Sequence, residues 1–345
     1  MRKDISNIYQ VLKIDEQSIT PKYMQVTNAI FNAIRHGHLK EKYLLPSISD
    51  LSFELDISRD TAEKAYRNLK KMGIIDSVPG KGYFVGSRKI DNMNRVLLMF
   101  NKLSHHKKII YDAFADTLGD FGMIDFYIYN NDYNLFQKIL KGKMDDYTYY
   151  VIIPHFTDSN SSPQEILNRL QGKNLILLDK NLDNVTGKVG AVFEDFEKDI
   201  YNALVEANDR LSKYNTLKII FPKNSYYPKE ILRGFVKFCV NFAFSYKIVE
   251  DIAREHLKNG EVYINLMDDD LVILLQKVKE TKLIPGKEIG IISYNETPVK
   301  EFILNGITTI STNFTEIGNI AAKMIRENNL GNISVDFKLT IRASL

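Results

Sequence analysis

The sequence predicts an α/β protein with a small N-terminal winged helix-turn-helix domain and a larger two-lobed domain built on parallel sheets. Residues 21–85 show short amphipathic helical patterns and one hairpin pattern. From residue 95 onwards, apolar runs of strand length alternate with amphipathic helical runs. The polar stretch SRKIDNMN (87–94) separates the two patterns and predicts a linker. A chain of 345 residues is also too long for one average domain.

The composition limits the class of protein. Hydrophobic residues make up 44% of the chain and charged residues 26%, which is typical of a globular protein. No apolar run approaches the ~18 residues of a membrane-spanning helix, and the N-terminus lacks the pattern of a signal peptide. The single cysteine, Cys239, cannot form an internal disulfide. We therefore expect a cytoplasmic protein that does not contact a membrane.

Three helices are predicted in the N-terminal domain. The first begins at Thr20-Pro21, because proline is favoured at the first helical position. The second begins at Ser47, which forms the capping pattern [ST]-x-x-[DE] with Asp50. A two-residue turn leads to the third helix, which Ser58 caps and Gly73 ends. Two helices joined by such a tight turn form a helix-turn-helix layout.

A DNA-binding surface is predicted on the third helix and the hairpin. The apolar side chains of this helix face inward, so its polar side chains face outward, as in a helix that enters the major groove. The sequence PGKG (79–82) lies between two short apolar runs and predicts a β-wing with Lys81 at its tip. Residues 21–88 hold eleven basic and seven acidic side chains, a net charge of +4 that suits a polyanion. The alternative is a small helical domain with an ordinary charged surface. The predicted DNA-contacting residues are Ser47, Ser49, Ser58, Arg59, Asp60, Thr61, Glu63, Lys64, Arg67, Gly80, Lys81 and Gly82.

The same segments carry a resemblance to a known family. They are PKYMQV (21–26), LLPSISDLSFELDISRDTAEKAYRNLKKMGII (44–75) and PGKGYFV (79–85), and they resemble the winged-helix domain of GntR-type bacterial transcription regulators. Arg59 matches the arginine that follows the capping serine in that family. Ser49 and Glu63 stand where many relatives carry arginine, which leaves the base preference open. Glu63 can accept a hydrogen bond from cytosine N4, or it can pair with Arg59 or Arg67 on its own helix.

The sequence from residue 95 onwards, called the body below, predicts an architecture based on β-sheets. Continuous apolar strands that alternate with helices are typical of parallel sheets covered on both faces. The predicted strands are 96–100, 126–129, 150–153, 175–179, 189–193, 217–221, 246–249, 262–265, 289–294 and 308–310. The predicted helices are 107–121, 135–140, 164–170, 196–213, 229–241, 252–257, 269–280, 299–304 and 314–327. About ten strands exceed one such unit, so we expect two lobes, with ligands at the carboxyl ends of the strands.

Several motifs of the body carry a second resemblance. They are Arg233-Gly234-Phe235, Asp268 at the start of a helix, GIISYNETP (290–298), and Thr308-Thr309-Ile310 before NFTEIGNIAAKMI. The body resembles the sugar-binding domain of LacI-type regulators, which is related to periplasmic binding proteins. A GntR-type winged domain at the N-terminus, called the head below, followed by such a body is the arrangement of the arabinose-repressor subfamily. The resemblance therefore implies a sugar effector.

The LacI-type resemblance also implies effector contacts. It assigns hydrogen bonds with the sugar to Arg233, Asp268 and Asn295, although relatives usually carry aspartate at the last position. Each has a structural alternative: Arg233 can bridge loops, Asp268 can cap the next helix, and Asn295 can shape the turn before Pro298. Loops of the first lobe add weaker candidates, namely Ser104, His105, Asn130, His155 and Lys180. His105-His106 lacks a third ligand at suitable spacing, so we expect no metal site.

These patterns predict a domain order and a function. We expect an N-terminal arm (1–20), the winged domain (21–86), the linker (87–94) and a two-lobed effector domain (95–345). Lobe 1 is expected at 95–187 and 311–335, and lobe 2 at 188–310 and 336–345. The predicted protein is a non-enzymatic, homodimeric repressor without a cofactor, which binds a palindromic operator under the control of a monosaccharide or sugar derivative. The alternatives are an enzyme-like body that responds to a non-sugar metabolite, or a cytoplasmic small-molecule-binding protein.

Overall fold

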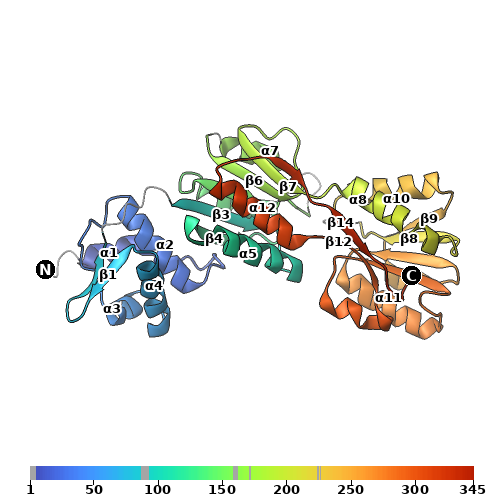
Figure 1. Ribbon diagram of the computed structural model, residues 1–345, viewed down its shortest axis with the longest axis horizontal. Helices are drawn as coiled ribbons and strands as arrows, with labels where there is room; N and C mark the ends of the chain where they lie inside the picture. The colour runs from blue at the N-terminus through green and yellow to red at the C-terminus, as the bar shows by residue number, and fades with distance from the viewer. Residues whose placement is uncertain (1–4, 87–92, 158–161, 171, 224, 226) are drawn as a thin grey trace.

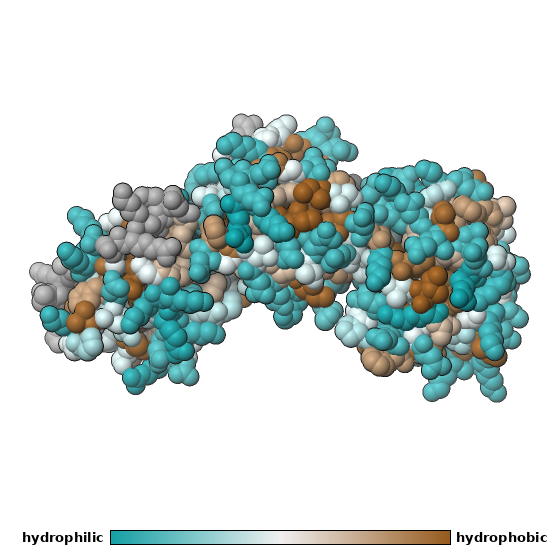
Figure 2. All heavy atoms as spheres, in the orientation of Figure 1, coloured by the Kyte–Doolittle hydropathy of each residue, from teal (hydrophilic) through white to brown (hydrophobic). Residues whose placement is uncertain are grey.

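The computed structural model describes residues 5–86, 93–157, 162–170, 172–223, 225 and 227–345. A winged head, lobe 1 and lobe 2 follow one another along the long axis of the molecule, with the N-terminus in the head and the C-terminus in lobe 2 (Figure 1). Hydrophilic residues cover most of the face drawn in Figure 2, and apolar residues gather there in small patches on the two lobes. None of the helices in the described residues is both long and apolar enough to cross a membrane. The predicted linker lies largely at 87–92, outside the described residues.

The head is a winged helix-turn-helix domain. It consists of α1 (Ile5–Val11), α2 (Lys22–Arg35), α3 (Ile48–Glu54), α4 (Arg59–Lys71), β1 (Ile75–Val78) and β2 (Gly82–Val85). The side chains of Ser47 and Ser58 accept hydrogen bonds from the backbone N–H groups of Asp50 and Thr61, which fixes the starts of α3 and α4. β1 and β2 pair in antiparallel fashion and form the wing.

The N-terminal arm is part of the head. Ile8 and Leu12 are 2% exposed and pack in the same apolar core as Phe31, Leu51 and Leu69. The sequence prediction treated residues 1–20 as separate from the winged domain. The short apolar face of α1 is instead buried by the three helices of that domain, because a seven-residue helix cannot cover its apolar side chains alone.

Lobe 1 is a six-stranded parallel sheet with helices on both faces. Its order is β13-β7-β6-β5-β3-β4. The strands are β3 (Asn94–Phe100), β4 (Gly122–Ile128), β5 (Tyr149–Ile152), β6 (Asn174–Asp179), β7 (Lys188–Phe193) and β13 (Asn332–Ser334). Alternate residues of β3 face opposite sides of the sheet. Leu98 packs with α5 (His105–Leu118) and α12 (Phe314–Arg326), whereas Leu97 packs with α6 (Tyr133–Lys141) and α7 (Pro163–Leu167).

Lobe 2 repeats this architecture with one antiparallel strand at the edge. Its sheet has the order β14-β12-β11-β10-β8-β9, in which β14 runs antiparallel to β12. The strands are β8 (Thr216–Ile220), β9 (Ser245–Val249), β10 (Glu261–Asn265), β11 (Ile289–Tyr294), β12 (Thr308–Thr312) and β14 (Phe337–Thr340). Helices α8 (Phe196–Glu206) and α10 (Glu230–Asn241) cover one face, and α11 (Asp268–Thr281) covers the other.

The predicted fold class and all ten predicted strands are confirmed, whereas the predicted boundary between the lobes is wrong. Strand β7 pairs with β6 in the sheet of lobe 1, although the prediction assigned residue 188 onwards to lobe 2. The chain crosses between lobes after β7, between β12 and α12, and between β13 and β14. The apolar alternation reveals each strand but carries no information on which of two sheets it joins.

Short elements account for the remaining differences from the prediction. Strands β13 and β14 were not predicted, because three or four mostly exposed or half-buried residues give no clear apolar pattern. The helix predicted at 252–257 is a single 3-10 turn, η3 (Ile252–Arg254). The helix predicted at 299–304 is two 3-10 pieces, η4 (Pro298–Glu301) and η5 (Ile303–Asn305).

Candidate functional site

The outer face of α4 presents polar side chains from the first half of the helix. Arg59, Asp60 and Lys64 are exposed, while the opposite face buries Ala62, Ala65, Tyr66 and Leu69. The Tyr66 hydroxyl donates a hydrogen bond of 2.8 Å to the Pro46 carbonyl, so α4 is held against the chain that leads into α3. Hydrophilic residues cover the part of the head where α4 lies (Figure 2).

Two charged side chains of α4 have partners within the head. Glu63 forms an ion pair of 2.9 Å with Arg67, one helical turn further on. This is one of the two roles left open by the sequence. The Lys64 Nζ lies 4.1 Å from the centroid of the Tyr23 ring, over its face. Arg67 remains 73% exposed in its pair, so its guanidinium stays accessible to an anion.

The wing and the start of α3 lie beside this helix. Gly80 and Gly82 adopt φ values of 75° and 97°, a left-handed region that glycine enters without strain. They form the wing turn, in which exposed Lys81 lies between them. The Lys70 Nζ donates a hydrogen bond of 2.7 Å to the Ser77 hydroxyl and links α4 to the wing. Ser47 and Ser49 lie exposed at the start of α3.

The second candidate site is a cavity between the two lobes. Its volume is about 30 Å³, and an adjoining cavity holds about 70 Å³. The residues that line the first cavity come from both lobes, and all except Pro228 are polar or aromatic: Asn101, Lys102, His106, Lys107, His155, Asp179, Glu194, Phe196, Tyr227, Pro228, Tyr294, Asn295 and Phe314. Asp179 ends β6, Glu194 follows β7 and Asn295 follows β11, as expected for a site at the carboxyl ends of parallel strands. Ligand pockets commonly hold about 300 Å³ or more, so this conformation is closed.

Four charged or titratable side chains form a buried cluster on the lobe 1 side. Lys107 forms an ion pair with the carboxylate of Asp179, and His155 Nε2 lies 3.0 Å from the same carboxylate. Glu194 forms a side-chain hydrogen bond with Asp179, and all four residues are at most 7% exposed. Asp179 also has a φ of 73°, an uncommon conformation for a residue other than glycine.

The cluster sets the charge of its members. Burial alone would raise the pKa of Asp179, but Lys107 and His155 hold that pKa well below its usual value. Burial and the charge of Asp179 raise the pKa of Glu194 well above its usual value, which favours the protonated form of Glu194 as the donor to Asp179. Burial lowers the pKa of His155. Burial and the Lys107 charge lower the pKa of nearby His106 to about 3, so both imidazoles are neutral at pH 7.

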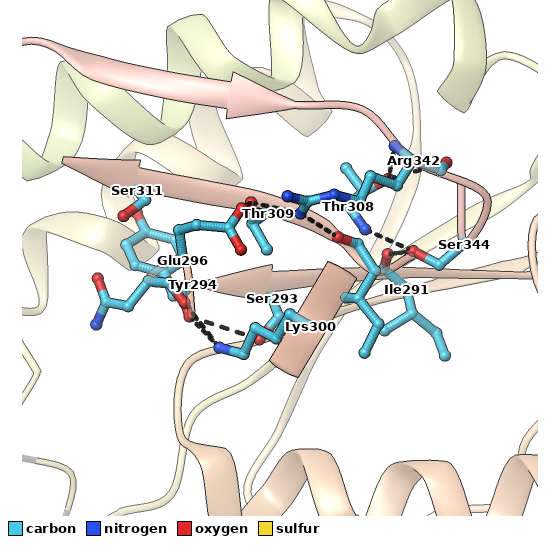
Figure 3. Close-up of polar contacts among 12 residues, drawn as sticks. Ile291, Ser293, Tyr294, Glu296, Lys300, Thr308, Thr309, Ser311, Arg342 and Ser344 are labelled. Atoms are coloured by element: carbon cyan, nitrogen blue, oxygen red, sulfur yellow. Dashed lines mark hydrogen bonds and ion pairs between the residues drawn. The ribbon is translucent and has the colours of Figure 1, made fainter. Parts of the chain in front are cut away.

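On the lobe 2 side of the cavity, a buried lysine stabilises the turn that follows β11. Lys300 is 2% exposed, and its Nζ donates to the carbonyls of Tyr294 and Asn295 at 2.8 Å each. It also forms an ion pair of 3.0 Å with Asp268. Burial lowers the pKa of Lys300, and the Asp268 carboxylate opposes that shift. Lys300 points toward the end of β11 in Figure 3 and fixes the turn that carries Asn295.

The C-terminal residues secure the other side of this turn. Arg342 Nη1 donates to the Glu296 carboxylate at 2.8 Å (Figure 3). It also donates to the Ile307 carbonyl at 2.9 Å. The Ser344 hydroxyl donates to the Ile291 carbonyl at 2.6 Å and accepts from the Thr308 N–H at 2.8 Å. These contacts tie the C-terminal residues to β11 and to the start of β12.

The structure brings together only part of the predicted effector set. His155 and Asn295 line the first cavity, and Ser104, His105 and Asp268 line the adjoining one. Lys180 lies outside these linings and forms an ion pair of 3.7 Å with Glu230 of the other lobe. Exposed Asn130 is also outside them.

Arg233 is not in either cavity lining. Its side chain is 59% exposed on α10 and pairs with Glu197 at 2.9 Å and with Glu230 at 3.6 Å. In this conformation Arg233 connects two helices, α10 and α8, rather than the loops named as its structural alternative. Within the described part of the chain, no group of three His, Cys, Asp or Glu side chains could hold a metal ion.

Sequence reasoning missed the centre of the cavity. Lys107, Asp179 and Glu194 were not among the predicted contacts, nor were the aromatic residues Phe196 and Phe314. The position of Asp179 offered a signal, because an acidic residue at the end of an apolar strand points to the ligand-binding edge of a parallel sheet. Lys300 had no comparable signal, since its burial depends on the fold of η4.

Comparisons with known proteins agree with both parts of the chain. Residues 22–85 match the family described as bacterial regulatory proteins, gntR family. The HTH-type transcriptional repressor NagR of Bacillus subtilis (strain 168) is 30% identical over 91 residues, which are 26% of this chain and 37% of that protein. The matched region thus spans well under two thirds of this curated relative.

Solved structures match the body. The trehalose repressor from Escherichia coli has a TM-score of 0.59 at 14% identity and covers 72% of this chain and 99% of its own. A periplasmic binding protein/LacI transcriptional regulator from Alkaliphilus metalliredigens QYMF was solved in complex with D-xylulofuranose. It has a TM-score of 0.56 at 11% identity, and the match covers 73% of this chain and 98% of that chain. The chain therefore combines a GntR-type winged helix-turn-helix head with a body of the LacI-type, periplasmic-binding-protein-like fold.

Proposed function

We propose that this protein is a cytoplasmic transcriptional repressor whose affinity for an operator depends on a small, neutral, polyhydroxylated ligand bound between the two lobes. The observation that carries the proposal is the cavity formed by polar and aromatic residues of both lobes, in a chain that also has a winged helix-turn-helix head. A ligand that bridges two lobes favours one lobe arrangement over the other. Such a ligand can shift the position of anything attached to lobe 1.

The proposed DNA contacts are those of a major-groove helix. Arg59 and Arg67 lie exposed on α4, and Lys81 is exposed at the wing tip, where each can reach a phosphate or a base edge. The pairing of Glu63 with Arg67 favours a positioning role for Glu63. We further propose that two copies bind the two halves of a palindromic site, since one short helix contacts only a few base pairs.

The proposed ligand is neutral because the charges of the buried cluster are already matched. Lys107 is paired with Asp179, the raised pKa of Glu194 favours its neutral form, and His106 is neutral. A phosphate ester would require a positive charge that Asp179 does not already neutralise. Lys102 also lines both cavities, but burial and the Lys107 charge lower its pKa and so disfavour its charged form. Hydroxyl groups instead suit the amide of Asn295 and the carboxyl groups, and the rings of Phe196 and Phe314 offer apolar faces to a sugar. The printed names of the two solved structures above mention trehalose and D-xylulofuranose, which supports a sugar.

A ligand screen of the full-length protein tests the effector half of the proposal. Neutral mono- and disaccharides, matched sugar phosphates and amino acids are compared by thermal shift. We expect a neutral sugar to raise the Tm by a few degrees, because a ligand at about 100 times its Kd adds about 2.7 kcal/mol of stability. Asn295→Ala should abolish the shift, and the matched Arg233→Ala variant should retain it. Stabilisation by phosphates or amino acids alone would reject the neutral-sugar assignment.

A DNA-binding measurement tests the other half. Genomic fragments retained by the immobilised protein are assayed by fluorescence anisotropy at two salt concentrations, with and without the stabilising sugar. We expect a specific fragment whose affinity falls as salt rises, and falls by about five- to 150-fold with the sugar. Arg59→Ala should weaken this binding without changing the thermal shift. A protein that shows no salt-sensitive preference for any fragment would contradict the proposed function.

A further inference from the structure

The head of this protein is attached to lobe 1 by more than the covalent chain. Strand β4 is the last strand in the sheet of lobe 1, so one of its sides exposes backbone N–H and C=O groups. The head occupies that side. The Ile19 N–H donates to the Phe126 carbonyl at 3.0 Å, and the Phe126 N–H donates to the Thr20 hydroxyl at 2.7 Å. The Asn28 side-chain amide donates to the Ile124 carbonyl at 3.1 Å.

Side chains reinforce this backbone pairing. Asp15 accepts a hydrogen bond of 2.7 Å from the Tyr127 hydroxyl and forms an ion pair of 3.2 Å with Lys143. Asn28 donates to the Asp125 carboxylate at 2.7 Å. Burial alone would raise the pKa of Asp15, but the Tyr127 and Lys143 contacts lower that pKa and keep the carboxylate charged.

The central contacts of the interface are buried, and they lie beside a cavity of about 570 Å³ whose lining includes Asp15 and Asn28. Thr20 and Asn28 are 4% exposed, and Phe126 is 5% exposed. Met123 of β4 belongs to the apolar core of the head, in contact with residues of the winged domain. The head core and lobe 1 therefore share a buried contact, which a flexibly tethered head would lack.

The same arm residues are tied to the helix that supports α4. Gln25 of α2 accepts a hydrogen bond of 2.8 Å from the Asp15 N–H and donates one of 2.9 Å to the Thr20 carbonyl. Helix α2 in turn packs against α4 through the core of the head. The arm and α2 thus form a continuous chain of contacts from β4 to the proposed DNA-binding helix.

We infer that residues 15–20 form an intramolecular clamp that seats the winged head on the outer edge of β4, so that the head and lobe 1 move as one body. Its regulatory consequence rests on the proposed function. When the ligand moves lobe 1 relative to lobe 2, the clamp carries that movement to α4. The spacing of the two heads in a dimer then changes with the lobes.

The clamp is tested by a double variant of the full-length protein, Asp15→Asn with Thr20→Val. Valine keeps the branched shape of threonine and removes the hydroxyl that binds the Phe126 N–H. The matched control is Glu16→Gln, because Glu16 is 77% exposed and pairs with Lys22 inside the head. Hydrogen–deuterium exchange is measured for the peptides that contain Ile19 and Phe126. It requires neither DNA nor ligand.

We expect exchange in these two peptides to rise about tenfold or more in the double variant and to match the wild type in Glu16→Gln. The thermal shift by the sugar should be unchanged, and the sugar should no longer alter DNA affinity. Unchanged exchange would show that the clamp does not hold the head. Raised exchange with a wild-type sugar effect on DNA affinity would show that the clamp does not transmit the signal. A wild-type protein without DNA binding would instead reject the proposed function, while the exchange data still decide whether the clamp exists.

Discussion

At the scale of single residues, the buried ion pair between Lys107 and Asp179 is the strongest electrostatic feature of the cavity. Lys107 is 3% exposed and Asp179 is 7% exposed, so neither charge is stabilised by bulk water. Removal of one partner leaves the other charge buried without compensation, which costs about 3–5 kcal/mol in other proteins. Each partner is therefore needed to compensate the charge of the other in the folded lobe 1.

We predict that Lys107→Met lowers the free energy of unfolding by about 3–5 kcal/mol, measured by chemical denaturation. The matched control is Lys108→Met at the next position. Lys108 pairs with Asp112 on the exposed side of the same helix, where such a pair contributes less than about 1 kcal/mol. Equal losses in the two variants would contradict a special role for the buried pair.

Asp199 of α8 predicts a dependence of stability on pH. Burial and the charge of Asp195 raise the pKa of Asp199 to about 7. A carboxyl group whose pKa is raised on folding stabilises the protein most below its unfolded pKa of 3.8, and this contribution is lost as pH rises through about 7. We predict that Asp199→Asn has a higher Tm than the wild type at pH 8 and that the difference shrinks toward pH 4. The exposed Asp209→Asn should show no such trend, and a pH-independent difference for Asp199→Asn would contradict the prediction.

The candidate site could be predicted from the sequence only in outline. The edge of each sheet was predictable, because parallel strands place the carboxyl ends of β3, β5 and β6 at one edge of lobe 1, and the carboxyl end of β11 at the corresponding edge of lobe 2. Asn295 was found through a motif. Asp179 and Glu194 depend on which strands are neighbours, and Lys300 depends on the two short turns that bury it. These are properties of tertiary packing, which local sequence patterns do not contain.

At the scale of elements, close helix packing depends on single glycines. Gly318 lies where α12 meets α5, and a Cβ atom at this position would lie 2.4 Å from the Ile110 carbonyl oxygen. Real Cβ atoms do not approach backbone oxygens this closely, so an added methyl group must push the helices apart.

We predict that Gly318→Ala lowers the free energy of unfolding by about 1–3 kcal/mol, because overpacking a close-packed core has this cost. The matched control is Gly331→Ala, where a Cβ atom would meet no atom within 4 Å. Chemical denaturation of both variants provides the test. A destabilised Gly331→Ala together with an unaffected Gly318→Ala would contradict the packing argument.

Elements with long apolar patterns were predictable, and elements that depend on their neighbours were not. All ten predicted strands of the body are present, and most of them are nearly continuous buried runs, whereas the edge strand β9 is exposed apart from Val249. Strand β13 is three exposed residues long and exists only because β7 offers an edge to pair with. Helix α1 joins the head through Ile8 and Leu12, two residues whose partners lie far along the chain. Both cases are decided by long-range contacts.

At the scale of the whole molecule, the two lobes are closed over a cavity smaller than the proposed ligand. The surface narrows where lobe 1 meets lobe 2 (Figure 2). Three crossings of the chain connect the lobes, and the Lys180–Glu230 ion pair bridges them at 3.7 Å. Ligand entry therefore requires the lobes to separate, and this ion pair must break when they do.

We predict that Lys180→Met raises the association rate of the stabilising sugar. Both side chains of the pair are about one third exposed, so solvent screens the interaction and it contributes at most about 1 kcal/mol, or roughly fivefold in rate. Stopped-flow fluorescence can follow binding through the tyrosines, since the chain contains 19 of them and no tryptophan.

The control for this prediction removes a lysine whose ion pair lies within one lobe. Lys223 pairs with Glu250 at 3.2 Å inside lobe 2, so Lys223→Met changes the net charge equally but leaves the bridge between lobes intact. A neutral ligand should not respond to net charge alone, because long-range steering acts on charged partners. A rate increase confined to Lys180→Met therefore reports on lobe opening. Equal rates in both variants and the wild type would mean that the Lys180–Glu230 pair does not limit entry into the cavity.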